Sequence, residues 1–291
     1  MKTHVLVLGG NGFIGSAVVN ELRRSGLEVL VGTRAKGRCL RVGERRISFH
    51  AADDQDWDQA IKGCQIVINT VGILRQRWKE SYEQVHHEAV AKLADACAKK
   101  NVRLVHISVL GLQYDVRSRF LLSKARGEQA LLNSGADWVI VRPSLLEGKD
   151  GFGARWFRRI ANWPIHMTPA DAKGRIAPLH VRELARLVCR IAYKEGRTRI
   201  YELGGDRQFS FEDYLSHLAR SKPLLRIKVP GIVVRLLSHL LDLLHLTPLS
   251  YGHYELMRND NLPTNTSAPA RVGASNEGFL NRTETLYGNG R

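Results

Sequence analysis

An α/β fold built on a parallel sheet is predicted for this chain by three observations. The chain opens with an apolar run, 4–8, that leads at once into closely spaced glycines and then into residues at helical spacing, 16–24. Short apolar runs then alternate with amphipathic stretches. With 291 residues and 44% hydrophobic content, the chain can form one large domain and an appended lobe. These features predict a Rossmann-type doubly wound parallel sheet with a smaller C-terminal substrate lobe.

The glycine-rich turn after the first strand has the pattern of a dinucleotide-binding loop. Gly9 can make the sharp turn, Gly12 lets the backbone approach a pyrophosphate, and Gly15 lets the helix pack closely on the strand. The positive end of the following helix favours phosphate. The glycines fit G-x-x-G-x-x-G and G-x-G-x-x-G, so their spacing leaves the subfamily open. The predicted loop comprises Gly9, Gly10, Asn11, Gly12, Phe13, Ile14 and Gly15.

The second predicted strand, 28–34, ends where such folds place the residue that reads the adenosine ribose. An Asp or Glu there binds the 2′-hydroxyl and repels a 2′-phosphate, whereas this chain has Thr33 and Arg34. Because a guanidinium group suits phosphate, we expect NADP(H) in preference to NAD(H), which is the alternative cofactor. Arg34 can also be read as a surface residue of an arginine-rich loop.

The remaining apolar runs predict strands at 46–50, 65–71, 103–108 and 137–142, with helices at 57–61, 81–100 and 123–134. Ligands of such sheets bind beyond the carboxyl ends of the strands. We therefore expect Val71, Gly72, Ser108, Pro143 and Ser144 to lie along one edge with the glycine turn and Arg34.

The domain boundaries expected from these patterns are 1–148 for the dinucleotide-binding domain, 149–258 for a lobe interleaved with it, and 259–291 for a mobile tail. In the lobe we expect helices from 151 and over 182–192, and a proline-punctuated loop at 162–169. The apolar helix expected within 229–246 is too short to span a bilayer. It either packs on the lobe or lies in a membrane interface.

The formal net charge of +16 is the unusual bulk property of the chain. The basic residues form no long block, and no nucleic-acid-binding motif is present, so we expect no nucleic-acid partner. A solvated basic surface or contact with an anionic membrane fits better. The four cysteines are far apart without metal-ligand spacing, and no signal peptide is visible, so we expect reduced thiols, no metal site and a cytoplasmic location.

The order of these motifs resembles that of the extended and atypical short-chain dehydrogenases/reductases over about residues 1–260. The shared features are the glycine turn, Val71-Gly72, His-Ile-Ser108, Lys124 on the next helix, Arg142-Pro143-Ser144, and the stretches 178–181 and 201–205. The resemblance implies that Ser108, Lys124, Pro143 and Ser144 contribute to the cofactor site. Lys124 is then a ligand of the nicotinamide ribose.

Within that superfamily the chain is most similar to the nucleotide-binding accessory subunit of respiratory complex I and its bacterial relatives. The similar stretches are 67–74, 82–86 and 247–260. The resemblance implies a tightly held NADP(H), a membrane-complex protein partner, and a location peripheral to the inner membrane. It supplies no substrate.

The catalytic motif departs from that of the superfamily, which places a Tyr four residues before the Lys so that the ammonium lowers the phenol pKa. Phe120 occupies that position before Lys124, and phenylalanine cannot transfer a proton. Ser108 can still polarise a carbonyl, or simply bond nearby backbone. The adenine-binding position also departs, with His50 near Asp53 and Asp54 where relatives carry an Asp.

Two functional hypotheses follow. The first is a non-enzymatic or weakly catalytic NADP(H)-binding protein that supports assembly or stability of a respiratory or quinone-biosynthetic complex. The second is an active NAD(P)-dependent reductase, dehydratase or epimerase acting on a hydrophobic or sugar-like substrate.

Overall fold

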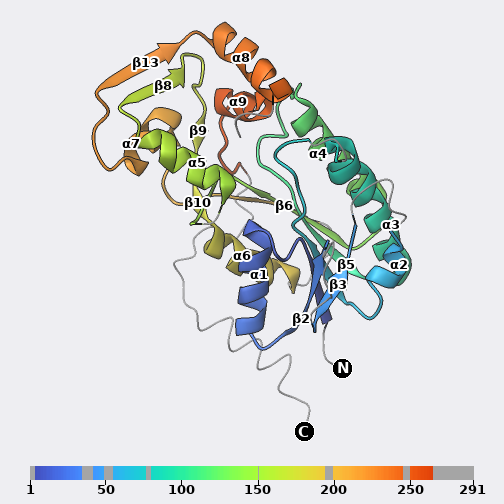
Figure 1. Cartoon of the computed structure of the whole chain (residues 1–291). Coiled ribbons are helices and arrows are strands. Elements are labelled where there is room, and N and C mark those ends of the chain that lie inside the picture. The colour runs from blue at the N-terminus through green and yellow to red at the C-terminus, as the bar shows by residue number, and fades with distance from the viewer. Residues whose placement is uncertain are drawn as a thin grey trace.

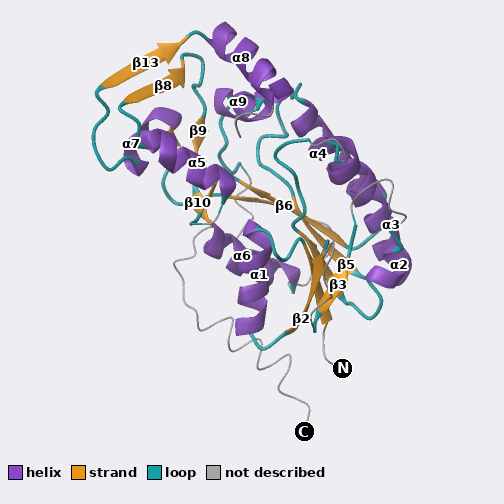
Figure 2. Ribbon diagram, viewed as in Figure 1, coloured by secondary structure: helices purple, strands orange, loops and turns teal. Residues whose placement is uncertain are grey.

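The computed structural model describes residues 4–34, 42–48, 55–76, 80–149, 151–193, 199–244 and 250–264. Among these residues, seven parallel strands form one sheet in the order β11-β6-β5-β4-β1-β2-β3, with helices on both faces (Figures 1 and 2). The predicted Rossmann-type fold class is therefore confirmed. The strands are β1 (His4–Leu8), β2 (Glu28–Thr33), β3 (Glu44–Arg46), β4 (Ile66–Asn69), β5 (Arg103–Ile107), β6 (Trp138–Pro143) and β11 (Arg199–Leu203).

Each central strand contributes to two apolar cores, because successive side chains of a strand point to opposite faces of the sheet. Val5 and Val7 of β1 pack in one core, and Leu6 and Leu8 pack in the other. Burial on both faces explains why these strands are continuous apolar runs in the sequence. The first core is covered by α1 (Phe13–Arg24) and α6 (Val181–Ala192), and the opposite face by α2 (Trp57–Ala60), α3 (Ala89–Lys100) and α4 (Arg119–Asn133) (Figure 1).

Three predicted boundaries differ from the structure. The third strand, expected at 46–50, is observed at Glu44–Arg46, where pairing with β2 sets its register. The long helix expected from 81 begins at 82 and contains a π-helical turn, η1 (Gln84–Glu88), before α3. The helix expected from 123 begins four residues earlier because the Ser118 hydroxyl accepts a hydrogen bond from the Leu121 amide and caps α4.

The C-terminal lobe is interleaved with the sheet, since α6 and β11 return to the large domain between lobe segments (Figure 1). Its core gathers Phe157, Phe211, Tyr214 and Met257. The loop expected at 162–169 contains a strand, whose partner lies about sixty residues later and so is not visible in local sequence. The lobe elements are β7 (Leu146–Glu147), α5 (Phe152–Ala161), β8 (Ile165–Pro169), β9 (Arg175–Ile176), β10 (Leu179–His180), β12 (Phe209–Ser210), α7 (Phe211–Leu218), β13 (Leu225–Val229), α8 (Gly231–Leu244) and α9 (Tyr251–Arg258).

Residues 259–264, the first part of the predicted tail, are hydrogen-bonded to the large domain. The Asn261 amide group donates to the Leu110 carbonyl over 2.8 Å, and Ser144 Oγ donates to the Asn261 carbonyl over 2.8 Å. The Thr264 backbone N–H donates to Glu202 Oε2 over 2.7 Å. The rest of the predicted tail, 265–291, lies outside the described residues.

A buried ion cluster joins α4, β6 and β11. Arg142 donates from Nε to Glu128 over 3.1 Å, and its Nη1 lies 3.6 Å from Glu202 Oε1. Both carboxylates are almost fully buried. One guanidinium group therefore neutralises two carboxylates that water barely reaches, and Glu202 in turn holds Thr264.

We expect Arg142→Leu to lower the free energy of unfolding by roughly 3 kcal/mol, because it removes the guanidinium group that contacts both buried carboxylates. Chemical denaturation at pH 7 measures the loss. Arg126→Leu is the matched control, since it removes an arginine whose pair with Glu83 is exposed and worth at most about 1 kcal/mol. Equal losses in the two variants would contradict this account.

Candidate functional site

The turn between β1 and α1 has the backbone of a phosphate-binding loop. Gly9 has φ of 73°, in the left-handed region that favours glycine, and the Gly12 N–H donates to the Gly9 carbonyl over 2.8 Å. A Cβ on Gly15 would lie 2.2 Å from the Gly9 carbonyl oxygen, so only glycine lets α1 approach β1 this closely. The first turn of α1 carries no side-chain cap and no acidic residue, which leaves its N–H groups available to an anion.

The other predicted loop residues separate into different roles. Asn11 Nδ2 donates to Thr33 Oγ1 over 3.1 Å, which brings the turn to the end of β2. The Phe13 ring instead packs on the entrance to the lobe, where a Cβ on Gly148 or Gly151 would approach it within 2.7 or 2.8 Å. Ile14 packs against the core under α1. Phe13 and Ile14 thus anchor the turn through packing with the lobe and with the core under α1, respectively.

Arg34, the predicted phosphate ligand, is paired with a carboxylate that the sequence did not single out. Its Nη1 lies 2.6 Å from Glu80 Oε1, and the Arg34 side chain is 63% exposed whereas Glu80 is 13% exposed. Glu80 follows β4 and comes from a different part of the sheet edge. A carboxylate and a guanidinium group, the two groups that distinguish a ribose hydroxyl from a ribose phosphate, thus lie side by side. The predicted adenine-side residues, His50 to Asp54, lie outside the described residues.

The strand ends bring together a buried polar group. Asn69 Oδ1 accepts a hydrogen bond from the Val71 N–H over 3.1 Å, and its Nδ2 lies 3.1 Å from His106 Nδ1 on the paired strand. Burial lowers the pKa of His106 to about 3, so this imidazole is neutral. Ser108 Oγ is buried without a hydrogen-bond partner among the described residues. A buried unsatisfied hydroxyl is costly, and this one lies at the end of β5 where ligands bind.

Ser144 and Pro143, also predicted to line the site, make contacts within the protein. Ser144 Oγ accepts from the Ala177 N–H over 3.2 Å in addition to its bond with Asn261, and the Pro143 carbonyl accepts from the Leu110 N–H over 3.0 Å. These bonds fix the end of β6 and the segment that crosses it.

Lys124 is buried beside the loop after β4. Gly72 lies next to the ammonium, since a Cβ at this position would be 3.8 Å from Lys124 Nζ, an ordinary contact distance. Burial lowers the pKa of Lys124 to about 8, and the charge of Glu128 one turn later partly opposes the shift. A buried amine with a depressed pKa at the edge where ligands bind is a candidate ligand for a polar or anionic group.

Phe120, which the sequence predicts to replace the usual tyrosine, is packed on three sides. Its ring centroid lies 5.5 Å from that of Tyr82 and 5.6 Å from those of His86 and His253, with the His253 ring stacked on it. Lys124 Nζ lies 5.8 Å from the same centroid, so the two residues share one face of α4. Phe120 is 5% exposed. The side chain beside the lysine is therefore part of an aromatic cluster and offers no proton.

His86, which the sequence did not place in the site, has a defined tautomer. Its Nε2 accepts from the Ile73 N–H over 3.1 Å, so Nδ1 carries the proton and donates to Ser123 Oγ over 3.0 Å. Burial holds the pKa of His86 well below its usual value, and the nearby Lys124 charge adds to the shift. The side chain is locked and neutral. Only the stretch 82–86 within the family resemblance pointed toward it.

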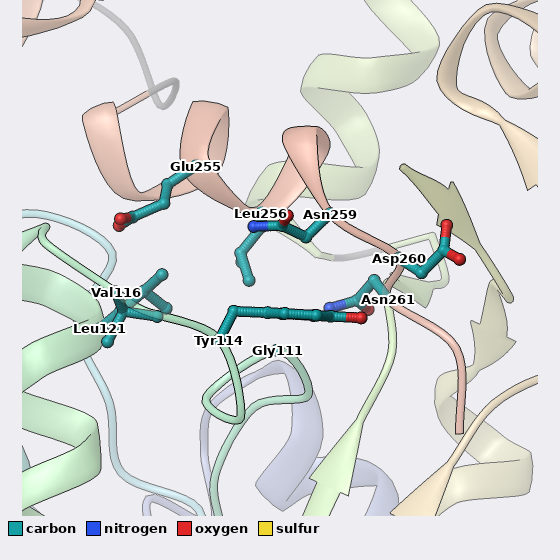
Figure 3. A pocket seen from close by; sticks show the side chains of 9 residues that line it. All are labelled: Gly111, Tyr114, Val116, Leu121, Glu255, Leu256, Asn259, Asp260 and Asn261. Carbon is teal, nitrogen blue, oxygen red and sulfur yellow. The ribbon is translucent and has the colours of Figure 1, made fainter. Parts of the chain in front are cut away.

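Tyr114 lines a shallow hollow beyond β5. The hollow is bounded by the loop after β5, by Leu121 at the start of α4 and by the end of α9 (Figure 3). The Tyr114 ring extends toward Asn261, and Glu255 lies on the opposite wall (Figure 3).

Comparison with known proteins identifies similarity in both sequence and fold. Residues 9–159 match the model of a family described as NAD(P)H-binding. A 220-residue region is 30% identical to the mitochondrial NADH dehydrogenase [ubiquinone] 1 alpha subcomplex subunit 9 of Dictyostelium discoideum, covering 72% of this chain and 61% of that protein. This chain therefore spans less than two thirds of that relative.

Two further matches extend over most of the chain. A protein of Caulobacter vibrioides named ceramide reductase is 26% identical over 288 residues, which is 92% of this chain and 88% of that protein. The structure of the UDP-glucose 4-epimerase of Thermus thermophilus in complex with NAD matches this fold with a TM-score of 0.58 at 19% identity. The match covers 87% of this chain and 99% of the epimerase chain. The latter match concerns the fold alone.

We expect Lys124→Met to raise the free energy of unfolding of the nucleotide-free protein at pH 7 by roughly 2 kcal/mol. Between pH 8, the folded pKa of Lys124, and 10.5, its ordinary value, the unfolded chain binds more protons than the folded chain. The stability of the parent protein therefore rises with pH across this window, and the advantage of the variant shrinks. Chemical denaturation from pH 7 to 10 measures both.

Lys92→Met, at an exposed position on α3, is the matched control and leaves the pH dependence unchanged. A Lys124→Met advantage that stays constant up to pH 10 would refute the depressed pKa.

Proposed function

Because this chain belongs to the NAD(P)H-binding family, we propose that it is an NADP(H)-binding protein whose nucleotide stabilises a fold used in assembly or stability of a membrane-bound respiratory or quinone-biosynthetic complex. The observation that carries the proposal is the combination of a complete glycine turn with Phe120 in the place of the proton donor. The glycine turn that would bind the nucleotide of a reductase is present, whereas Phe120 stands where a reductase has its proton donor.

The residues around the sheet edge support nucleotide binding. The uncapped start of α1 suits the pyrophosphate, with Gly9, Gly12 and Gly15 giving it access to the backbone. Lys124 beside Gly72 is assigned to the nicotinamide ribose, and the unsatisfied hydroxyl of Ser108 to the nicotinamide end. When bound, the nucleotide supplies a hydride donor or acceptor.

The choice of NADP(H) rests on Arg34. Its guanidinium group is exposed and can bind a 2′-phosphate while still touching Glu80. Glu80 works against this choice, because its carboxylate repels the phosphate and can accept a hydrogen bond from a ribose 2′-hydroxyl. We therefore assign selectivity to the pair, with Arg34 favouring NADP(H) and Glu80 limiting the preference.

The residues around Phe120 support a binding role over proton-coupled catalysis. The other polar rings of the cluster are engaged within the protein. His86 is neutral with both nitrogens bonded, burial lowers the pKa of His253 to about 4, and the Tyr82 hydroxyl donates to the Leu74 carbonyl. A phenol in the place of Phe120 would have had Lys124 within one turn to lower its pKa. Without it, this edge can hold a cofactor but has no group in the usual position to exchange a proton with a substrate.

The partner is proposed from the names of the relatives. Subunits of NADH dehydrogenase [ubiquinone] appear among the matches, which suggests a protein partner in a membrane complex and a location peripheral to the membrane. None of the helices in the described segments is long and apolar enough to cross a bilayer.

A second candidate is a reductase acting on a lipid carbonyl group. The match to a protein named ceramide reductase favours it, because that match covers nearly all of both chains. Hydride from the nicotinamide would go to the carbonyl carbon, and the proton on the oxygen would come from water or another group in place of Phe120.

Protein purified without added nucleotide is expected to retain NADP(H), identified by mass spectrometry.

In binding titrations Arg34→Ala should weaken the affinity for NADPH by at least about tenfold while changing the affinity for NADH little, because only NADPH offers the charge-assisted phosphate contact. Glu80→Gln, the matched variant on the same ion pair, should strengthen NADPH. Equal loss of both nucleotides in Arg34→Ala would remove the phosphate role.

NADPH oxidation separates the two candidate functions. With a panel of long-chain lipid ketones as substrates, we expect the parent protein to oxidise NADPH no faster than the background rate. The Phe120→Tyr variant should bind NADPH with unchanged affinity. Its free energy of unfolding should fall by about 1–2 kcal/mol, because the added hydroxyl enters a packed aromatic cluster. Turnover by the parent protein would overturn the non-catalytic proposal and support the reductase.

A further inference from the structure

The two-stranded ribbon of β8 and β13 carries its apolar side chains on the outside. The pairing places Leu225 opposite Ile165 and Ile227 opposite Met167. These four side chains share one face, and all four are exposed, Met167 by 62%. An apolar face of a sheet normally covers a core, so this orientation is the reverse of what folding alone favours.

The opposite face of the ribbon is polar and points into the lobe. His166 and Thr168 are buried there, with the His166 ring bonded to the Ala161 carbonyl at 2.9 Å. Arg226 lies 3.3 Å from Glu212 on α7, and Lys228 pairs with the same carboxylate. The register is thus fixed by polar contacts with the lobe, which keep the apolar face outward.

Helix α8, which follows β13 directly, repeats this orientation. Ser238 is buried, the His239 ring stacks on Tyr251 of α9 at 4.4 Å, and Arg235 lies 6.0 Å from the same ring. Ser238 therefore marks the side of α8 that faces the protein, while Arg235 and His239 contact Tyr251 at the border of that side and remain exposed. The apolar stripe is exposed, and its members are Ile232, Val233, Leu236, Leu237 and Leu240.

These two faces adjoin along one border of the lobe, where β8, β13 and α8 lie at its outer rim (Figure 1). We call this surface the apolar edge: the outward side chains of β8 and β13 together with the exposed stripe of α8. Apolar patches of this extent on a protein surface mark sites of protein or membrane contact.

The charges around the apolar edge indicate which contact it makes. Residues 220–240 contain no Asp or Glu but hold Arg220, Lys222, Arg226, Lys228 and Arg235. Arg226 and Lys228 pair with Glu212 yet remain about half exposed to solvent, at 48% and 57%. Trp163, 56% exposed, lies two residues before Ile165 at the start of the ribbon. Apolar side chains bordered by basic residues and a tryptophan are the composition of a surface that enters the headgroup region of an anionic bilayer.

We propose that the apolar edge docks on an anionic lipid bilayer, with the ribbon and α8 entering the interface and the basic residues meeting lipid phosphates. This inference rests on the proposed peripheral location and assigns it to a surface. It differs from the sequence expectation for 229–246 in that the ribbon, of which β8 lies in the expected loop 162–169, supplies part of the contact.

Sedimentation with lipid vesicles tests the proposal on the full chain. We expect binding to vesicles that contain phosphatidylglycerol and weak binding to vesicles of phosphatidylcholine alone. Met167→Glu with Ile227→Glu on the ribbon, and Leu236→Glu with Leu240→Glu on α8, should each lower binding by about tenfold or more. Leu132→Glu on α4, at a similarly exposed leucine distant from the lobe, is the matched control and should bind like the parent.

NADPH titration of the same variants keeps this test separate from the nucleotide proposal, because exposed substitutions in the lobe should leave nucleotide affinity and folding unchanged. Vesicle binding that is unaffected by both pairs of glutamates would overturn the docking surface even if NADPH binds. A dimer that the ribbon substitutions dissociate, with no vesicle binding by the parent, would assign the edge to a second copy instead.

Discussion

The arrangement of the site depends on how closely α1 approaches the end of β1. The helix starts directly over the Gly9 carbonyl, at a distance that excludes any side chain on Gly15. Thr70 at the end of β4 reinforces this corner by donating from Oγ1 to the Leu8 carbonyl over 2.7 Å. The same corner directs the free N–H groups of α1 toward the sheet edge, so the contact that packs the helix also forms the proposed anion site.

Several polar and titratable side chains are buried around that edge of the sheet. The Lys124 ammonium is removed from water, His86 and His106 are kept neutral, and Ser108 lacks a hydrogen-bond partner among the described residues. The buried ammonium of Lys124 and the unsatisfied hydroxyl of Ser108 destabilise an empty site, and a polar ligand that contacts them relieves this cost. Binding of a nucleotide would therefore stabilise this fold by more than the contacts of the glycine turn alone.

The parts of the structure that local sequence encodes were predictable. The glycine turn, the alternation of strands and helices, and the substitution at Phe120 are each written in a few adjacent residues, and the fold class and the family resemblance are confirmed. The Arg34–Glu80 pair and the neighbours of Phe120 were not predictable, because they join residues that are distant in the chain. Pairing of β8 with β13 was missed for the same reason. The roles of the individual site residues stay predictions.

Helix α9 touches both the docking surface and the cofactor edge. Tyr251 contacts His239 of α8, and His253, two residues later and on the other side of the helix, stacks on Phe120. Through these two ring contacts, α9 connects the rim of the lobe to α4, the helix that carries Lys124. Linkage is reciprocal: if seating at a bilayer changes how tightly the nucleotide is held, loading of the nucleotide changes the seating by the same factor. Under that linkage, the fraction of this protein bound to membranes varies with how much of the nucleotide is available to it.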